Sequence, residues 1–377
     1  MLIGLEVAQA DRSEKTGVDW YAWHVTQALK RTPGQETHTW LMYSRETVSN
    51  GLGQAPSNWH PRALSWPIHS LWTNVRLSFE LHRHRPDVLF MPAGRLPRII
   101  PKHSVVILSD VGFFRHPHLY SSRELAWLRF TTKDCLRRAS QIIAVSDYAK
   151  QELVQHGKVQ PERITVIHPG SDHLSTERVS EGEQRSVTDA YRIPGPYFLA
   201  VGQVGSRQNY LTLIEGFRRY KEDRGLGDPT CLVLVGSPGE NHGQIEAAIQ
   251  RAKMGGSIVQ TGYLAEEDKR VLMMGAIALV QAAWSTRFGL AGLEAESLGC
   301  PVIAARSGSL PELLGVEEVC WFDPADAETL AQALDRLTRE QPYRDSLIAQ
   351  GKDWSAQYRW EDAAKQTLNL FTNWSNR

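Results

Sequence analysis

The sequence predicts an α/β protein made of two Rossmann-like domains. Its 377 residues are too many for one ordinary hydrophobic core, because single cores stop growing at roughly 250–300 residues. Short apolar runs alternate with amphipathic segments along nearly the whole chain, a pattern typical of βαβ units and a parallel sheet. A polar stretch at 171–196 separates two such series. We therefore expect a first domain at 1–175, a linker at 176–195, a second domain at 196–357 and a closing helix at 358–377.

The first series alternates strands and helices. Its predicted strands are short runs rich in large apolar and β-branched residues, and amphipathic segments fit between them. The predicted strands are residues 2–8, 37–44, 87–93, 104–110, 141–147 and 164–170. The predicted helices are residues 17–31, 70–84, 122–139 and 147–157. In the last helix Asp147 suits an N-cap and Gly157 suits a stop.

The second series begins after the polar stretch and has the same character. Its predicted strands are residues 197–203, 230–238, 257–263, 276–284, 300–305 and 319–324. The chain closes with an amphipathic segment at 360–374, which we expect to form a helix that packs on the first domain. No obvious sequence repeat relates the two series, which favours two Rossmann-like domains over a solenoid.

The composition favours a cytoplasmic protein that does not bind nucleic acid. Lys and Arg number 42, as do Asp and Glu, so a formal charge of zero creates no global field to recruit nucleic acid. The four cysteines are widely spaced in apolar contexts, as buried free thiols of a reducing compartment would be. We expect no export signal and no membrane span. Peripheral contact with the inner face of a membrane stays open, because residues 70–86 with Arg95, Arg98 and Lys102 combine basic and aromatic side chains, although an ordinary helix surface is the plainer interpretation.

Two strand-to-helix turns of the first domain are candidate sites. Ligands of open α/β sheets bind beyond the carboxyl ends of the strands, so these turns are where a site is expected. Gly17, followed by Val18, would let a backbone approach a phosphate or sugar, although a plain helix start explains it too. Ser109 and Asp110 follow a strand and either face a cleft or simply end the strand through turn chemistry.

Two turns of the second domain have the same potential. Gly202 and Arg207 precede a helix that begins near Asn209, and glycine, a cation and a helix N-terminus together make an anion site. Gly289 begins another helix, and Glu294 lies one turn into it, where a carboxylate can accept hydrogen bonds from the two hydroxyls of a ribose. A glycine turn or a solvated helix glutamate is the plainer interpretation of either feature alone.

The order and spacing of these four turns resemble the retaining GT-B glycosyltransferases of the large family four, the glycosyl transferases group 1. The resemblance covers essentially the whole chain and is most specific at residues 142–172, 198–220 and 288–315. It implies two Rossmann-like domains facing across a cleft, with the last helix crossing back to the first domain. It also implies transfer of a hexose from a nucleoside diphosphate sugar to a glycan or lipid-linked acceptor, in polysaccharide biosynthesis. The nucleotide-sugar is then a substrate, and we expect no cofactor and no metal, since this fold class manages the diphosphate with cations and helix dipoles.

The resemblance also implies donor-binding roles for individual residues. Glu294 matches the family acid that holds the ribose. Phe288, Gly289 and Leu290 form the loop that would lie under the donor sugar and its diphosphate. The other donor-binding candidates are Gly17, Val18, Asp110, Gly202, Gln208 and Asn209.

Several donor-contacting side chains differ from the family pattern. Thr286 stands where the first of two family glutamates belongs, and Arg287 replaces the glycine that follows. Gln208 replaces the lysine that contacts the diphosphate, and Ser109 replaces the histidine of a His-Asp pair. We expect Arg207 and Arg287 to assist the leaving phosphate, so the predicted catalytic residues are Arg207, Thr286, Arg287 and Ser109. The replacements keep a second interpretation open, in which the protein is a non-catalytic GT-B relative that acts as a binding or scaffold subunit.

Overall fold

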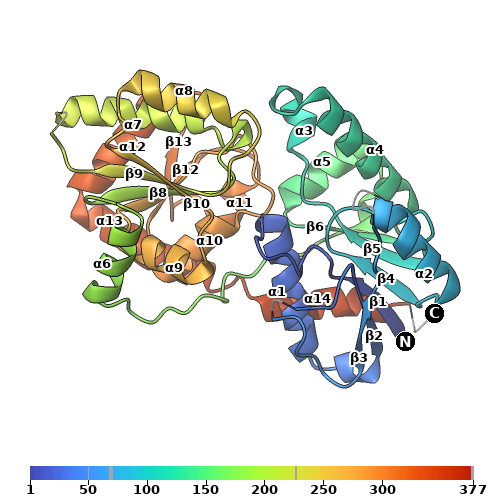
Figure 1. Cartoon of the computed structure of the whole chain (residues 1–377). Helices are drawn as coiled ribbons and strands as arrows, with labels where there is room; N and C mark the ends of the chain where they lie inside the picture. Colours follow the sequence, from blue (N-terminus) through green and yellow to red (C-terminus); the bar gives the residue numbers. More distant parts are fainter. Residues whose placement is uncertain (50, 68–70, 226, 375–377) are drawn as a thin grey trace. The chain divides into compact units, whose positions relative to one another are not determined.

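The chain folds into two compact units. The computed structural model describes residues 1–49, 51–67, 71–225 and 227–374. Unit 1 comprises Met1–Gly170 together with Arg359–Arg377, and unit 2 comprises Ser171–Tyr358 (Figure 1). Each unit is a parallel sheet covered by helices, so both are Rossmann-like.

Unit 1 is built on a seven-stranded parallel sheet of order β3-β2-β1-β4-β5-β6-β7. Its strands are β1 (Leu2–Glu6), β2 (Thr39–Ser44), β3 (Trp59–Ala63), β4 (Val88–Met91), β5 (His103–Ile107), β6 (Gln141–Ala144) and β7 (Ile164–Val166). Its helices are α1 (Gly17–Arg31), η1 (Gln35–Thr37), η3 (Trp72–Leu77), α2 (Ser78–Arg83), α3 (Gly112–Arg115), η4 (Pro117–Leu119), α4 (Ser122–Arg138), α5 (Asp147–Gly157), η5 (Pro161–Arg163) and α14 (Trp360–Thr372).

The last helix, α14, packs into unit 1 beside α1 (Figure 1). Phe371 is fully buried and lies 5.4 Å from Phe90 of β4 between ring centroids. At the other end of the helix, Trp360 stacks on His24 of α1 at 5.0 Å. The chain therefore returns to its first unit after completing the second, and apolar burial holds it there.

Unit 2 has a six-stranded parallel sheet of order β10-β9-β8-β11-β12-β13. Its strands are β8 (Tyr197–Val201), β9 (Cys231–Val235), β10 (Ile258–Gly262), β11 (Ala278–Gln281), β12 (Val302–Ala305) and β13 (Cys320–Phe322). Its helices are α6 (Glu181–Ala190), η6 (Ser206–Gln208), α7 (Tyr210–Arg224), α8 (His242–Ala252), α9 (Glu266–Gly275), α10 (Leu290–Leu298), α11 (Leu310–Leu313), α12 (Ala327–Arg339) and α13 (Gln341–Ser355).

In both sheets the strand order reverses at one point. The reversal lies between β1 and β4 in unit 1 and between β8 and β11 in unit 2. The loops that leave such a pair of strands diverge to opposite faces of the sheet, which leaves a crevice where α/β proteins bind ligands. The carboxyl ends of these four strands are therefore the places to look for sites.

The structure corrects the predicted helix at 70–84. Ser70 lies outside the described residues, and the rest of the segment forms η3, a turn of π-helix, followed by the short helix α2. The predicted N-cap Asp147 is also wrong by one residue. Ser146 is the N-cap of α5, because its hydroxyl accepts a hydrogen bond from the backbone N–H of Ala149 at 3.0 Å, and Asp147 is the first helical residue.

Several elements lie where none was predicted, and β3 and α6 are two of them. β3 is the edge strand of its sheet, where Pro61 is tolerated because its missing N–H faces away from the ladder. The segment predicted as a linker contains α6, which belongs to unit 2. Within the described residues, no helix combines the length and apolar character that crossing a membrane requires.

The four cysteines are free and buried, as predicted.

Candidate donor site on unit 2

The turn after β8 is shaped by glycines that approach other backbone and side chains closely. Gly202 has φ +148°, and a β carbon there would lie 2.8 Å from Nε2 of Gln208. Gly236, in the turn after β9, would place a β carbon against the carbonyl oxygen of Gly202. Larger residues cannot occupy these two positions without a shift, so the turn after β8 is a compact backbone surface at the sheet reversal.

Asn209 connects this turn to α7. It has φ +56°, a conformation that asparagine tolerates better than most residues. Its Nδ2 donates to the carbonyl of Pro324 at 2.8 Å, and its Oδ1 accepts from the hydroxyl of Thr212 at 2.9 Å. Both polar atoms of the Asn209 side chain therefore make hydrogen bonds within unit 2. These bonds fix the position of the preceding η6 turn, which contains Arg207 and Gln208.

The loop after β11 meets this turn across the reversal. The backbone N–H of Trp284 donates to the carbonyl of Arg207 at 3.3 Å. Further along the loop, the hydroxyl of Thr286 accepts a hydrogen bond from the backbone N–H of Gly289 at 3.3 Å. The structure thus brings together the predicted residues of the η6 turn and those that precede α10, and it uses Thr286 to order the loop.

The start of α10 is tightly packed. Gly289 is its N-cap with φ +63°, and a β carbon there would lie 2.8 Å from a methyl group of Leu313. Phe288 and Leu290 on either side are buried. This part of the loop therefore offers backbone rather than apolar side chains to a ligand.

Glu294 lies on α10 within a buried cluster of charged groups. Its Oε2 is 3.0 Å from Nζ of Lys269 on α9, and its Oε1 is 3.2 Å from Nε2 of His173. The same Lys269 ammonium lies 2.9 Å from Oε2 of Glu266, one turn earlier on α9. Only 5% of the Glu294 side chain is exposed, so these partners supply most of what the carboxylate would otherwise receive from water.

The electrostatics of the cluster keep Glu294 ionised. Burial by itself would raise the pKa of Glu294, but Lys269 and His173 outweigh it and hold the pKa below its usual range. Burial likewise disfavours the charged form of Lys269, yet Glu294 and Glu266 raise its pKa above the ordinary value. The pair is therefore a stable ion pair at neutral pH.

The same cluster has the donor set of a metal site. His173, Glu266 and Glu294 each offer one ligand atom, and these atoms lie within 4.8 Å of one another. The Lys269 ammonium, however, already contacts both carboxylates, at 2.9 and 3.0 Å. The cluster thus includes its own cation, and a metal would have to displace the Lys269 ammonium from both carboxylates.

The predicted residues of the first domain lie on unit 1. Gly17 and Val18 begin α1, whose first turn is closed by a capping box between Thr16 and Asp19. Ser109 follows β5 and is buried. Asp110 is the next residue, and its carboxylate accepts a hydrogen bond from the Tyr120 hydroxyl at 3.0 Å. Gly17 and Val18 follow β1, whereas Ser109 and Asp110 follow β5, and both segments leave the sheet at the carboxyl ends of its strands. Because β4 lies between β1 and β5, the sheet alone does not bring the two segments together.

Sequence reasoning missed the partners of Glu294. Lys269 belongs to the run EEDKR, which is typical of a solvated helix face, and its spacing of three from Glu266 is the single local signal of an ion pair. His173 follows the last strand of unit 1 by several residues and has no local signal. These residues meet only because α9, α10 and the start of unit 2 pack together.

Comparison with known proteins places both units in glycosyltransferase families. A family model described as Glycosyl transferases group 1 matches residues 190–354, and one described as Glycosyltransferase Family 4 matches residues 16–173. The O-antigen chain mannosyltransferase B of Escherichia coli is 25% identical over 315 residues, which are 83% of this chain and 77% of that protein.

Solved structures show the same fold over the whole chain. Sucrose-phosphate synthase from Thermosynechococcus elongatus aligns with a TM-score of 0.78 at 18% identity and covers 100% of this chain and 99% of that one. Anabaena HepE in complex with UDP and glucose aligns with a TM-score of 0.74 at 17% identity and covers 99% and 100%. Two Rossmann-like units, a helix that returns to the first and these matches together show that the chain has the GT-B fold and belongs to the group 1 glycosyltransferases of family 4.

Proposed function

We propose that unit 2 binds a nucleoside diphosphate sugar and that the protein transfers its hexose, with retention, to a glycan or lipid-linked acceptor. The observation that supports this most is the contact between the η6 turn and the loop after β11, with Glu294 on the helix that follows, at the reversal of the sheet. A site at such a reversal is where nucleotides bind in this class of sheet. The proposal requires no metal ion.

In this site Glu294 would accept hydrogen bonds from the ribose hydroxyls. Its carboxylate is ionised, as that role requires, but the ribose must share it with Lys269 and His173. The turn at Gly202 would approach the diphosphate with its backbone, and Arg207 and Arg287 would supply positive charge to the leaving phosphate. Retention needs that phosphate to be stabilised on the face from which the acceptor hydroxyl arrives.

The transfer should be slow. Gln208 supplies no charge to a developing diphosphate, and Thr286 offers one short hydroxyl that already accepts a hydrogen bond from Gly289. One preorganised group that faces developing charge is typically worth about 3–4 kcal/mol in the transition state. These replacements favour the second candidate function, a GT-B relative that binds a nucleotide or a partner without turnover.

We further propose that unit 1 touches the inner face of a membrane, where lipid-linked acceptors are found. The region first considered, 70–86 with Arg95, is only partly suited, because Trp72 is buried and Arg95 bonds to Thr73. The clearer surface is on α4, where the side chains of Trp127 and Phe130 are 50% and 71% exposed. Exposed basic residues flank them on the same helix: Arg123, Lys133 and Arg137.

Calorimetry with UDP, GDP and ADP tests the donor site. Loss of a charged hydrogen-bond acceptor costs about 1.5–3 kcal/mol, so Glu294→Gln should weaken binding of the preferred nucleotide by roughly ten- to a hundredfold. Glu296→Gln, two residues further on α10, is the matched control and should leave the affinity unchanged. Equal affinity of wild type and Glu294→Gln would remove Glu294 from the site, and the same measurement on Arg207→Gln keeps the test informative if the first variant does not fold.

Turnover separates the two candidate functions. Wild type should transfer or hydrolyse the common UDP-, GDP- and ADP-sugars weakly, and Gln208→Lys combined with Thr286→Glu should raise that rate at least about tenfold. Robust wild-type turnover would contradict the weakened site. Nucleotide binding without turnover in either protein would favour the binding subunit.

A further inference from the structure

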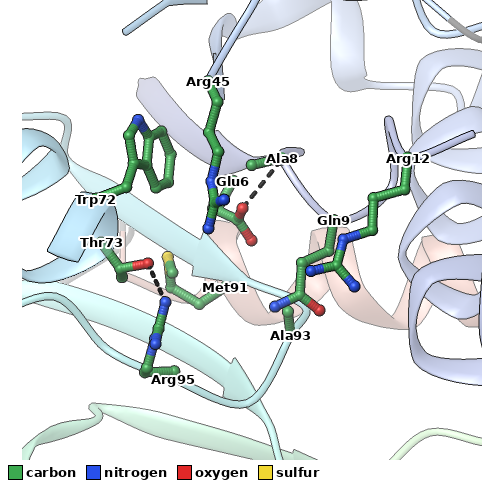
Figure 2. Close-up of a pocket in the computed structure, with 10 residues that line it drawn as sticks. All are labelled: Glu6, Ala8, Gln9, Arg12, Arg45, Trp72, Thr73, Met91, Ala93 and Arg95. Carbon is green, nitrogen blue, oxygen red and sulfur yellow. Dashed lines mark hydrogen bonds between the residues drawn. The ribbon is translucent and has the colours of Figure 1, made fainter. Parts of the chain in front are cut away.

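A small pocket opens on unit 1 where the strand order reverses between β1 and β4 (Figure 2). Its walls come from the ends of these two strands, from the segments that follow β1 and β2, and from η3. The space between these walls is about 320 Å³, a figure that includes space open to solvent, so the pocket is a shallow opening rather than an enclosed cavity. This pocket is the counterpart on unit 1 of the donor site on unit 2, because each lies at its sheet's reversal.

Three arginines line the pocket and two of them are braced. Arg95 follows β4, and its Nη2 donates to the hydroxyl of Thr73 in η3 (Figure 2). Arg45 follows β2, and its guanidinium lies 5.7 Å from the centre of the Trp72 ring. Such contacts hold guanidinium groups in place before a ligand arrives, which reduces the entropy lost on binding.

The third arginine lies nearer the solvent. Arg12 has 52% of its side chain exposed, and its Nη1 is 3.6 Å from Oδ1 of Asp19, which is itself buried on α1.

Burial of Arg95 lowers the pKa of its guanidinium, although Glu6 acts in the opposite direction. A charge that has lost part of its hydration gains more from an anionic ligand than a surface charge does.

Glu6 forms the inner wall of the pocket. It is the last residue of β1, only 4% exposed, and its Oε1 accepts a hydrogen bond from the backbone N–H of Ala8 at 2.9 Å. Burial raises the pKa of Glu6 to about 7, with Asp19 acting in the same direction and Arg95 and Arg45 acting against it. Glu6 therefore gains or loses its proton close to neutral pH, and it is the one acidic side chain in the pocket lining.

We propose that this pocket binds the phosphate of a phosphorylated acceptor through Arg95, Arg45 and Arg12, with Glu6 present as the uncharged carboxyl group. The charge count favours a doubly charged anion. With Glu6 protonated, three guanidinium groups and the Asp19 carboxylate leave two positive charges, which match a phosphate monoester. An ionised Glu6 would instead repel the ligand, whereas its protonated form can donate a hydrogen bond to a phosphate oxygen. The assignment of the phosphate to an acceptor rests on the proposed function.

Calorimetry on the full chain without nucleotide tests the anion site, and sulfate is the first probe because its charge does not change between about pH 6 and about pH 8. If only the protonated form of Glu6 admits the anion, wild-type affinity should fall about tenfold between these two values. The affinity of Glu6→Gln for sulfate should not depend on pH.

Arg95→Gln should weaken sulfate binding at least about tenfold. Arg98 is an exposed arginine on the same segment, and Arg98→Gln should leave sulfate binding unchanged.

Two controls keep the result unambiguous. Arg207→Gln on unit 2 should leave sulfate affinity unchanged, since a loss there would mean that the anion occupies the donor site. Arg12→Gln replaces an exposed side chain and tests the pocket if Arg95→Gln fails to fold. Sulfate binding that is independent of pH in wild type, or unaffected by both arginine variants, would overturn the proposal.

Sugar ligands identify the source of the anion. Glucose 6-phosphate should bind more tightly than sulfate, whereas glucose should not bind in the same range. Glucuronate binding as tightly as glucose 6-phosphate would overturn the preference for phosphate, and sulfate binding with no gain from the sugar would overturn the acceptor assignment. If sulfate binds as expected while UDP, GDP and ADP do not, the donor proposal fails and the anion pocket stands.

Discussion

Glu294 and Glu296 lie two residues apart on α10, yet their surroundings shift their pKa values in opposite directions. Glu294 has Lys269 and His173 beside it and stays ionised. Both carboxylate oxygens of Glu296 are buried without a hydrogen-bond partner, and burial, with Glu318 adding to it, raises the pKa of Glu296 well above its usual value. Composition and spacing cannot reveal this difference, because it depends on which helices pack against each side of α10.

We expect Glu296→Gln to stabilise unit 2 at neutral pH. A carboxyl whose pKa is raised on folding contributes its full stability below the unfolded value near 4.5 and loses it as the pH rises. At pH 7 the ionisation of this side chain in the unfolded state therefore lowers the stability of the fold, and removal of the titration should increase the free energy of unfolding. Urea unfolding of both proteins at about pH 4 and about pH 7 checks this, since the gain must be smaller at the lower pH. A gain of equal size at both pH values would contradict it.

At the scale of single residues, the sequence predicts a ribose-binding role for Glu294, which stays a prediction, and it does not reveal the environment of that carboxylate. The glycine turn and the helix that follows predict a carboxylate near a ligand, and such reasoning is local. Lys269, on a different helix, and His173, at the start of unit 2, meet Glu294 only through tertiary packing. The roles given to Arg207, Thr286, Arg287 and Ser109 stay predictions for the same reason.

Among the elements, α5 shows how a helix boundary depends on one hydroxyl. Ser146 is fully buried with extended backbone, and its side chain satisfies the N–H of Ala149. We expect Ser146→Ala to lower the free energy of unfolding by about 1 kcal/mol, the usual loss for such a cap. Asp147→Ala is the matched control. It removes a negative charge from the first turn of the helix and should lower the free energy of unfolding by only about 0.3–0.5 kcal/mol. Denaturant unfolding measures both, and a larger loss at Asp147 would restore it as the cap.

Two of the elements that escaped sequence prediction, β3 and α6, are held by polar or edge contacts. β3 exposes most of its residues, so it lacks the apolar alternation of a buried strand, and Trp59 stacked on Trp40 at 4.3 Å anchors it. α6 has few apolar residues, and it is fixed by hydrogen bonds such as Tyr191 to Asp268 at 2.6 Å and Gln184 to Tyr197 at 2.9 Å. Neither segment contains a run of large apolar residues, which is the feature that marks a buried strand or helix in a single sequence.

For the molecule as a whole, the alternation of apolar runs was sufficient to predict two parallel sheets, because every predicted strand is present in one of them. The return of α14 to unit 1 could also be predicted, since Trp360 and the apolar face behind it need a core. Surface chemistry was harder to predict. Exposed aromatic residues on α4 are indistinguishable in sequence from the buried ones on α1.

That exposed surface leads to a prediction for the whole protein at a membrane. Trp127 and Phe130 lie one turn apart on α4, and an aromatic pair flanked by basic residues suits the interface of an anionic bilayer. Each Lys or Arg near such a surface contributes about 1 kcal/mol to binding, and salt screens this attraction.

We expect the protein to float with vesicles that contain phosphatidylglycerol and not with vesicles of phosphatidylcholine alone, and to be released at high salt. Trp127→Ser with Phe130→Ser should reduce binding at least about tenfold. Leu211 is an apolar residue of unit 2 that is 43% exposed, so Leu211→Ser is the control and should bind as wild type does. Equal binding to both kinds of vesicle, or full binding by the double variant, would show that α4 is not the contact.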